Sequence, residues 1–229
     1  MSRKRVAVLI SGRGSNMAAL IEAAKADDYP AEIALVVSNR PDAGGLATAR
    51  AAGIATEVVD HTRFGKDRAA FERALQAVLK QHRIEIVCLA GFMRLLTPWL
   101  VERWQGRMLN IHPALLPDFK GLDTHRRALE AGAKVHGATV HFVVPEMDAG
   151  PIVAQGKVDV RPDDTEKTLA ERVLTVEHRI YPLALKLVAE GRVSIKEDGK
   201  CHIAGDVPPD DALIVPGGQV CIGRPCTVL

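Results

Sequence analysis

Two polar side chains at the end of a short apolar run are the residues best placed to do chemistry. Asn110 and His112 lie in the segment 109–113, and residues two apart on a strand share one face, so both would point into one crevice. An amide donor beside an imidazole at the carboxyl end of a parallel strand suits the stabilisation of oxygen charge in acyl transfer. Pro113 favours an extended conformation at His112. We therefore take Asn110 and His112 as candidate catalytic residues.

A carboxylate is needed near this histidine, because an imidazole that donates to a developing oxyanion should be protonated. Asp148, in the turn-rich segment 145–151, is the candidate. A lone histidine and a lone turn aspartate would favour structural roles, but the combination favours a site. The chain offers no convincing nucleophile for the histidine, since Cys88 lies within an apolar strand. Direct attack by a substrate amine is the better interpretation.

A glycine-rich loop, Ser11–Asn16, follows the first apolar run and opens the first helical pattern. Backbone N–H groups and the helix dipole at such a point favour a phosphate, although an ordinary tight turn would need the same glycines. The loop lacks the Lys-Ser/Thr pair of a Walker motif, and Ser38-Asn39 stand where a dinucleotide fold would carry an acid. A simple phosphorylated ligand is therefore favoured over a nucleotide cofactor.

The elements that must position these residues follow an α/β pattern. Short β-branched runs alternate with helical patterns up to about residue 110, which predicts a parallel sheet covered on both faces. The predicted strands are residues 5–10, 32–38, 56–59, 84–90 and 107–112. The predicted helices are residues 16–26, 44–52, 67–81 and, shorter, 98–104. The fold class is a doubly wound, mostly parallel, Rossmann-like sheet.

The second half changes character. Residues 136–144 and 152–160 predict an antiparallel hairpin whose connecting loop bears part of the site. Residues 163–165 are capping residues before a long helix that reaches Glu190, and Pro182 is expected to kink or end it. We expect a single domain over 1–195, with a phosphate-binding half (1–110) and a catalytic half (111–195), followed by a tail (196–229) of uncertain structure.

Composition excludes several classes of protein. The net charge of +2 with interleaved signs argues against a nucleic-acid partner, and no apolar run approaches the ~20 residues that span a bilayer. The segment 1–10 lacks a cleavage site, so a cytoplasmic protein is expected. The cysteines are expected to be free thiols: Cys88, Cys201, Cys221 and Cys226. No metal is assigned, because the spacing of three histidines matches no known ligand set: His125, His136 and His141.

Four segments together resemble the glycinamide ribonucleotide transformylases within the folate-dependent formyltransferase superfamily. They are 11–16, 89–96, 110–117, and 136–141 with 148–151. The resemblance covers about residues 5–195, and the trio Asn110, His112 and Asp148 is similar to that of the whole superfamily. It implies the formyltransferase fold and a transferase of purine (IMP) biosynthesis. Its co-substrate, 10-formyltetrahydrofolate, would pass a formyl group to the amine of 5'-phosphoribosylglycinamide.

The resemblance also implies binding roles that the residues alone do not indicate. Substrate contacts are implied for Gly14, Ser15, Asn16 and Glu177. Folate contacts are implied for Arg68, Met93, Arg94, Leu95, Leu96, Asn110, Val144, Pro145, Glu146, Met147 and Asp148. Taken alone, Glu177 and Arg68 would be exposed helix charges. Leu174 and Asp123 depart from the family pattern, which puts secondary substrate contacts in doubt.

Other functions stay open at this stage. A 10-formyltetrahydrofolate deformylase shares the trio but is expected to carry an additional N-terminal domain. Methionyl-tRNA and sugar-nucleotide formyltransferases are disfavoured by the glycine loop. A non-catalytic phosphometabolite-binding module would need the loop but not the trio. The expected partners are small molecules, with the chain a monomer or a homodimer.

Overall fold

The first strand shows why the N-terminal half forms a sheet. The computed structural model describes residues 3–207 and 213–214, and β1 (Lys4–Ile10) is a β-branched run in which Val6 to Ile10 are fully buried. A strand that is apolar on both faces belongs inside a parallel sheet with helices on either side. The described residues divide into two compact units, 1–111 with 142–147, and 112–141 with the residues from 148 onward.

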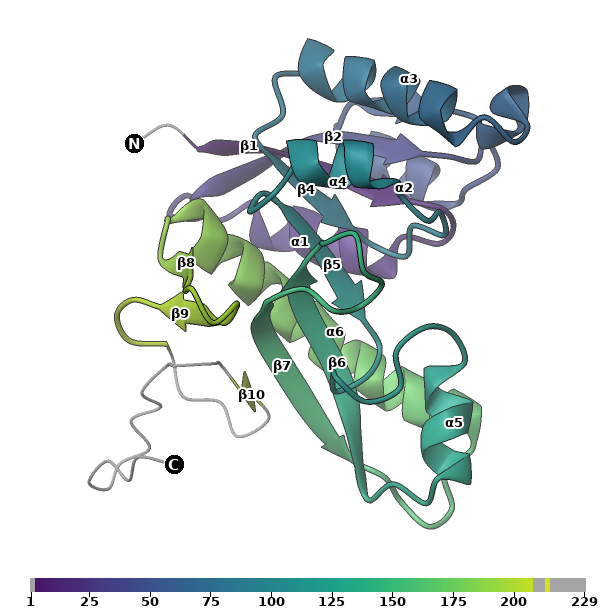
Figure 1. The fold of residues 1–229 in the computed structure, drawn as a ribbon, viewed down its shortest axis with the longest axis vertical. Helices are drawn as coiled ribbons and strands as arrows, with labels where there is room; N and C mark the ends of the chain where they lie inside the picture. The colour runs from purple at the N-terminus through teal and green to yellow at the C-terminus, as the bar shows by residue number, and fades with distance from the viewer. Residues whose placement is uncertain (1–2, 208–212, 215–229) are drawn as a thin grey trace. The chain divides into compact units, whose positions relative to one another are not determined.

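Five parallel strands form the sheet of the first unit. Their order is β3-β2-β1-β4-β5, with every neighbouring pair parallel (Figure 1). The other strands are β2 (Ala31–Ser38), β3 (Thr56–Val58), β4 (Ile86–Leu89) and β5 (Met108–His112). Strand order reverses at β1, and the loops after the carboxyl ends around such a point commonly bind ligands. The predicted strands are confirmed, with ends differing by one or two residues.

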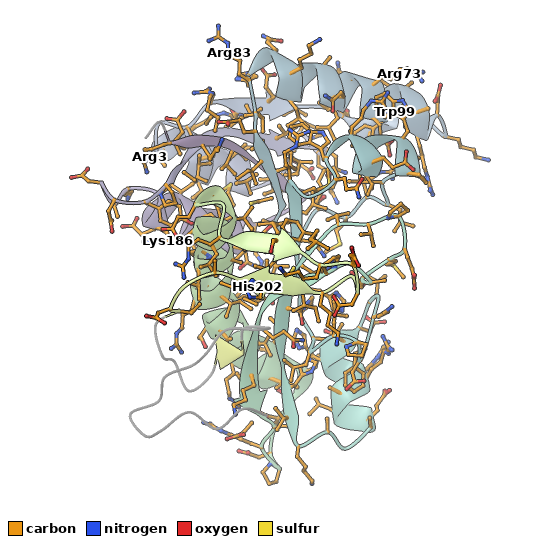
Figure 2. The ribbon with its side chains drawn as sticks, turned by 60° about the vertical axis from the view of Figure 1, so that its left-hand side comes forward. Arg3, Arg73, Arg83, Trp99, Lys186 and His202 are labelled. Carbon is orange, nitrogen blue, oxygen red and sulfur yellow. The ribbon has the colours of Figure 1, made fainter. Side chains whose placement is uncertain are left out.

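Helices cover both faces of this sheet. They are α1 (Ser15–Ala23), α2 (Gly45–Ala51), α3 (Arg68–Gln81) and α4 (Pro98–Arg103), with a short 3-10 helix η1 (His61–Phe64). On α3 the buried Phe71, Leu75 and Leu79 recur every four residues and pack on β1 and β2, whereas Arg73 is exposed (Figure 2). The four predicted helices are therefore present.

The second unit is built on an antiparallel hairpin. Strands β6 (Val135–Phe142) and β7 (Ile152–Asp159) pair antiparallel, and β10 (Leu213–Ile214) pairs with β7 (Figure 1). The parallel sheet and this hairpin confirm the predicted fold class. Helix α5 (Thr124–Glu130) and the hairpin of β8 (Val193–Ile195) with β9 (Cys201–Ile203) were not predicted. All three elements are seven residues or shorter, too short to show a clear period.

The long helix α6 (Glu166–Ala189) packs against β7. Its contact surface requires a glycine: a Cβ on Gly156 would lie 2.0 Å from Cγ1 of Val176 and 3.0 Å from Cγ2 of Ile180. Val176 and Ile180 lie four residues apart and are both buried, so they form one stripe of the helix. Pro182 does not end the helix, contrary to one of the two outcomes expected of it.

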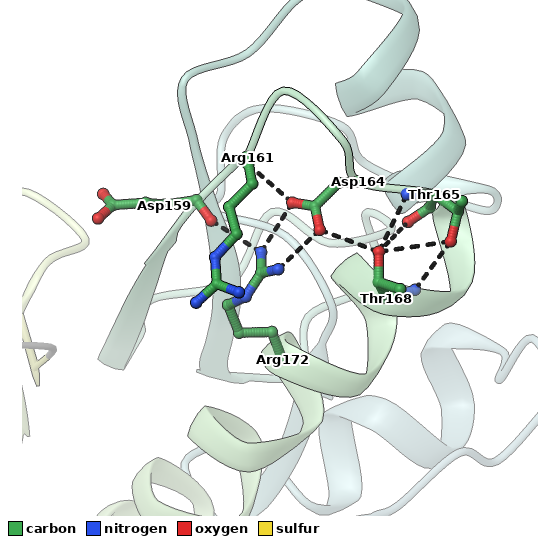
Figure 3. A network of polar contacts seen from close by, with 6 residues as sticks. All are labelled: Asp159, Arg161, Asp164, Thr165, Thr168 and Arg172. Carbon is green, nitrogen blue, oxygen red and sulfur yellow. Dashed lines mark hydrogen bonds and ion pairs between the residues drawn. The ribbon is translucent and has the colours of Figure 1, made fainter.

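A polar network fixes the start of α6 (Figure 3). Thr165 is the N-cap, and its hydroxyl accepts from the backbone N–H of Thr168 in a capping box. Asp164 accepts from both terminal nitrogens of Arg172, at 2.8 and 2.6 Å, and from the backbone N–H of Arg161 at 2.8 Å. The hydrogen bonds from Arg172 hold the pKa of Asp164 below its ordinary value. The expected capping residues therefore anchor the helix.

Candidate active site

The glycine loop lines a cavity in the first unit. The chain turns from β1 into α1 through Gly14, which has φ of +73° as the N-cap residue. A Cβ at Gly14 would lie 3.2 Å from Cα of Gly45, and the N–H of Gly45 donates to the carbonyl of Gly12 at 3.0 Å. The loop is therefore held tightly against the start of α2. Glycine is needed at position 14 for both its conformation and its close contact.

This cavity has a volume of about 380 Å³ and a cationic lining. Residues 11–16 form one side, and Arg40, His61 and Arg94 line it together with Arg13 of the loop. No aspartate or glutamate is among the lining residues. Backbone N–H groups at a helix start, with arginines around them, are suited to an anionic group. Gly14, Ser15 and Asn16, the predicted phosphate ligands, thus lie together in one cavity.

The predicted histidine–aspartate pair forms in the second unit. Nδ1 of His112 lies 3.4 Å from Oδ2 of Asp148, and both side chains are nearly buried, at 6% and 11% exposed. Nε2 of His112 lies 3.0 Å from the carbonyl oxygen of Phe119. Both ring nitrogens face oxygen acceptors, and only the doubly protonated ring can donate to both. The ring of His112 is therefore held between a carboxylate and a backbone carbonyl.

The backbone around Asp148 aims its carboxylate. Asp148 has φ of +50°, a left-handed conformation that aspartate tolerates better than most residues. Its Oδ2 also accepts from the backbone N–H of Gly121 at 2.9 Å, and its Oδ1 lies 3.7 Å from Nε2 of His141. The carboxylate is thus shared by two histidines and one amide. The sequence analysis assigned no site role to His141. This residue follows Val140 near the end of β6, so the two side chains point to opposite faces of the sheet.

The third member of the predicted trio lies on β5. Asn110 is half-buried, pairs in register with Leu89 of β4, and precedes His112 by two residues on the same strand. Glu177, implied as a substrate contact, is buried on α6 at 7% exposed. The expectation of an exposed carboxylate there is wrong, because Glu177 follows Val176 on the packed side of the helix.

The implied folate residues all lie in the first unit except Asp148. Met93 and Leu95 follow β4 and are 68% and 62% exposed, and Met147 is 53% exposed. Large exposed apolar side chains in loops are suited to contacting a flat, partly apolar ligand. Arg68 is exposed at the first turn of α3, and the guanidinium of Arg94 lies 5.9 Å from the ring centre of Phe71. Met93 and Leu95 are therefore surface residues and not part of the core.

The remaining implied folate residues occupy the same kinds of position. Leu96 is half-buried and packs against the core beneath α3 and α4. Val144, Pro145 and Glu146 form the loop after β6, together with Met147. Asp123, one of the departures, has φ of +56° and accepts from Arg126 at 2.6 Å. Nothing in the structure explains the leucine at position 174.

His125 and His136 pack against each other near the pair. The rings of His125 and His136 meet edge to face, with centroids 5.3 Å apart. Burial, with smaller contributions from His125 and His112, lowers the pKa of His136 to about 4, so its ring is neutral at physiological pH. Among the described residues no group of three or more potential metal ligands occurs. Cys88 and Cys201 are buried and take part in no disulfide among the described residues; Cys221 and Cys226 lie outside those residues.

The fold and the site together define an α/β protein that has a glycine-rich loop beside an arginine-lined cavity after its first strand and a buried histidine–aspartate pair. A family model described as formyl transferase matches residues 4–185. The phosphoribosylglycinamide formyltransferase of Escherichia coli (strain K12) is 45% identical over 204 residues, which cover 89% of this chain and 96% of that protein. The chain belongs to the formyl transferase family.

Solved and longer relatives agree with this membership. The crystal structure of phosphoribosylglycinamide formyltransferase from Brucella melitensis is 53% identical with a TM-score of 0.79, and the match covers 84% of this chain and 99% of that one. The trifunctional purine biosynthetic protein adenosine-3 of Gallus gallus is 51% identical over 199 residues. The chain spans 20% of the length of that relative. The predicted formyltransferase fold is confirmed.

Proposed function

We propose that this chain transfers the formyl group of 10-formyltetrahydrofolate to the amine of 5'-phosphoribosylglycinamide. The products are formylglycinamide ribonucleotide and tetrahydrofolate, in purine biosynthesis. The observation that carries the proposal is the buried pair of His112 and Asp148. His112 lies two residues after Asn110 on β5. The names of the relatives and the cationic cavity support the choice of a phosphorylated acceptor.

The reaction needs no protein nucleophile. The neutral amine attacks the formyl carbon, the new C–N bond forms, and the carbonyl oxygen takes up negative charge. Asn110 and His112 donate to this oxyanion, and Asp148 holds the imidazolium. The intermediate then collapses with cleavage of the bond to N10 of the folate. The proton lost by the amine ends on that leaving nitrogen, so atoms and charge balance.

The histidine must change one partner during this cycle. In the structure Nε2 of His112 donates to the carbonyl of Phe119, while Nδ1 faces Asp148. Donation to the oxyanion therefore requires the substrate oxygen to replace the carbonyl of Phe119 as the acceptor at Nε2. The ion pair with Asp148 keeps the ring oriented throughout this exchange. A charge-assisted donor of this kind is stronger than a neutral one.

The substrates are assigned to separate groups of residues. Gly14, Ser15 and Asn16 would hold the phosphate of the acceptor, and Glu177 its glycinamide portion. The folate would contact Arg68, residues 93–96 and residues 144–148. We further propose a single domain over 1–195 followed by the tail 196–229, in a cytoplasmic monomer or homodimer. The structure contains no helix, in the parts it describes, that is long and apolar enough to cross a membrane.

One assay separates this function from its rivals. Release of tetrahydrofolate from 10-formyltetrahydrofolate is followed with and without phosphoribosylglycinamide. Release that depends on the acceptor is the expected result. Equal release in both reactions, with formate as the second product, would identify a hydrolytic deformylase instead. Binding of the phosphorylated ligand without any release would identify a non-catalytic binding module.

A further inference from the structure

A chain of hydrogen bonds joins four loops at the carboxyl ends of the parallel strands in the first unit. The backbone N–H of Met93 donates to Oγ of Ser11 at 2.8 Å, and that hydroxyl donates to Oδ1 of Asn39 at 2.5 Å. Ser11 is the first residue of the glycine loop after β1, Asn39 follows β2, and Met93 follows β4. All three residues line the cationic cavity. The same network therefore contacts the proposed phosphate loop and the proposed folate segment.

The far end of the chain is anchored at η1. The carbonyl oxygen of Asn39 lies 2.8 Å from Nδ1 of His61 and accepts from the backbone N–H of His61 at 3.2 Å. Nδ1 of His61 also lies 3.2 Å from Nδ2 of Asn39, so this ring nitrogen contacts both the backbone carbonyl and the side-chain amide of Asn39. Asn39 is thus held by His61 at its backbone and its amide nitrogen, and by Ser11 at Oδ1. This fixes Asn39 in a single orientation.

Burial makes the network costly to disturb. Ser11 is 8% exposed and Asn39 is 2% exposed, so neither side chain can exchange its partners freely for water. The hydroxyl of Ser11 accepts from the Met93 amide and donates to Oδ1 of Asn39, so removing it takes a partner from both groups. Leaving a buried polar group without its partner changes a folding or binding equilibrium constant by about tenfold or more.

We infer that Ser11 and Asn39, anchored by His61, are positioning residues that set the backbone of segment 93–96 relative to the phosphate loop. This inference rests on the proposed function, because it assigns the folate to that segment. The residues act through the Met93 backbone and need not touch either substrate. A disturbance of the network should therefore weaken folate binding before it slows the chemical step.

The test compares Ser11→Ala with Ser38→Ala. Ser38 is a matched control, since it is a buried serine at the carboxyl end of the neighbouring strand β2, but its hydroxyl bonds to the backbone of Arg40 and not to segment 93–96. For Ser11→Ala we expect KM for 10-formyltetrahydrofolate to rise about tenfold with kcat within about twofold of wild type. Ser38→Ala should leave both values unchanged. Ser11→Thr, which keeps the hydroxyl, should recover most of the lost affinity.

A second variant keeps the inference falsifiable if Ser11→Ala folds poorly. Asn39→Ala should raise the same KM, and in the double variant with Ser11→Ala the effects should not add, because both break one network. Hydrogen exchange of the Met93 amide should speed up in each variant. Unchanged folate KM in a folded Ser11→Ala protein, or an equal rise in Ser38→Ala, would overturn the inference. Absence of acceptor-dependent turnover in the wild type would instead defeat the proposed function.

Discussion

The glycine at the contact between β7 and α6 offers the sharpest structural prediction. In Gly156→Ala the new Cβ would lie 2.0 Å from Cγ1 of Val176, whereas carbon atoms in contact lie ~3.5 Å apart or more. The methyl of Val176 must therefore retreat by roughly 1.5 Å. Overpacking of this kind costs about 1–3 kcal/mol, and the stiffer unfolded chain offsets about 0.4–1 kcal/mol of it. We expect a net loss of about 1–2 kcal/mol.

Thermal unfolding measures this loss directly. For a chain of this length each kcal/mol lowers Tm by roughly 2–4 °C, so Gly156→Ala should melt about 2–8 °C below wild type. Gly44→Ala is the control, because no atom lies within 4 Å of its added Cβ and its φ is −59°. Its unfolding free energy should change by less than about 0.5 kcal/mol.

The cause of the loss is tested by relieving the clash. Val176→Ala removes the obstructing methyl. The loss of unfolding free energy in the double variant with Gly156→Ala should therefore be smaller than the summed losses of the two single variants, by about 0.5–3 kcal/mol. Because Glu177 is the next residue on α6, Gly156→Ala should also raise KM for the phosphorylated acceptor. A wild-type Tm in Gly156→Ala, or strictly additive losses in the double variant, would refute this account of the helix contact.

Three further outcomes follow from the site and its surroundings. Asn110→Ala should lower kcat about 100- to 1000-fold with Tm nearly unchanged, and turnover close to wild type would remove Asn110 from the oxyanion site. The pKa of Asp164 is depressed by Arg172, so its contribution to stability is present above the unfolded pKa of about 4 and disappears as pH falls through the lower folded pKa. The difference in Tm between wild type and Asp164→Asn should accordingly be largest above about pH 5 and decrease below about pH 4. A difference that stays the same at all pH values would contradict this. Burial raises the pKa of Cys201 to about 12, so peptide mapping after iodoacetamide at pH 8 should find it unmodified until denaturant is added, and rapid labelling in the native protein would disprove its burial.

The parallel sheet was predictable because its strands are buried on both faces and form β-branched runs that alternate with helical patterns. The pairing of His112 with Asp148 was also predictable, from the chemical need for a carboxylate beside a donating imidazole. The contact from His112 to Phe119 was not predictable. It uses a backbone carbonyl in a loop where Phe119 has φ of +52°, a conformation that phenylalanine does not favour.

Burial of individual polar residues was the other limit of prediction. Glu177 resembles any helix carboxylate until the helix is packed, since helical period alone does not decide which of two neighbouring faces is buried. The network of Ser11, Asn39 and His61 depends on three loops whose ends meet only in the folded sheet. Side chains that meet through tertiary structure leave no spacing in the sequence to detect.

The central claim is that Asn110, His112 and Asp148 move a formyl group between two small molecules. The most direct measurement incubates the protein with 10-formyltetrahydrofolate labelled with ¹³C in the formyl carbon, together with phosphoribosylglycinamide, and locates the label by mass spectrometry. For the wild type we expect the label in the new N-formyl group on the former amine of the acceptor, and for His112→Ala we expect very little label there. Label recovered as free formate, or equal transfer by His112→Ala, would contradict it.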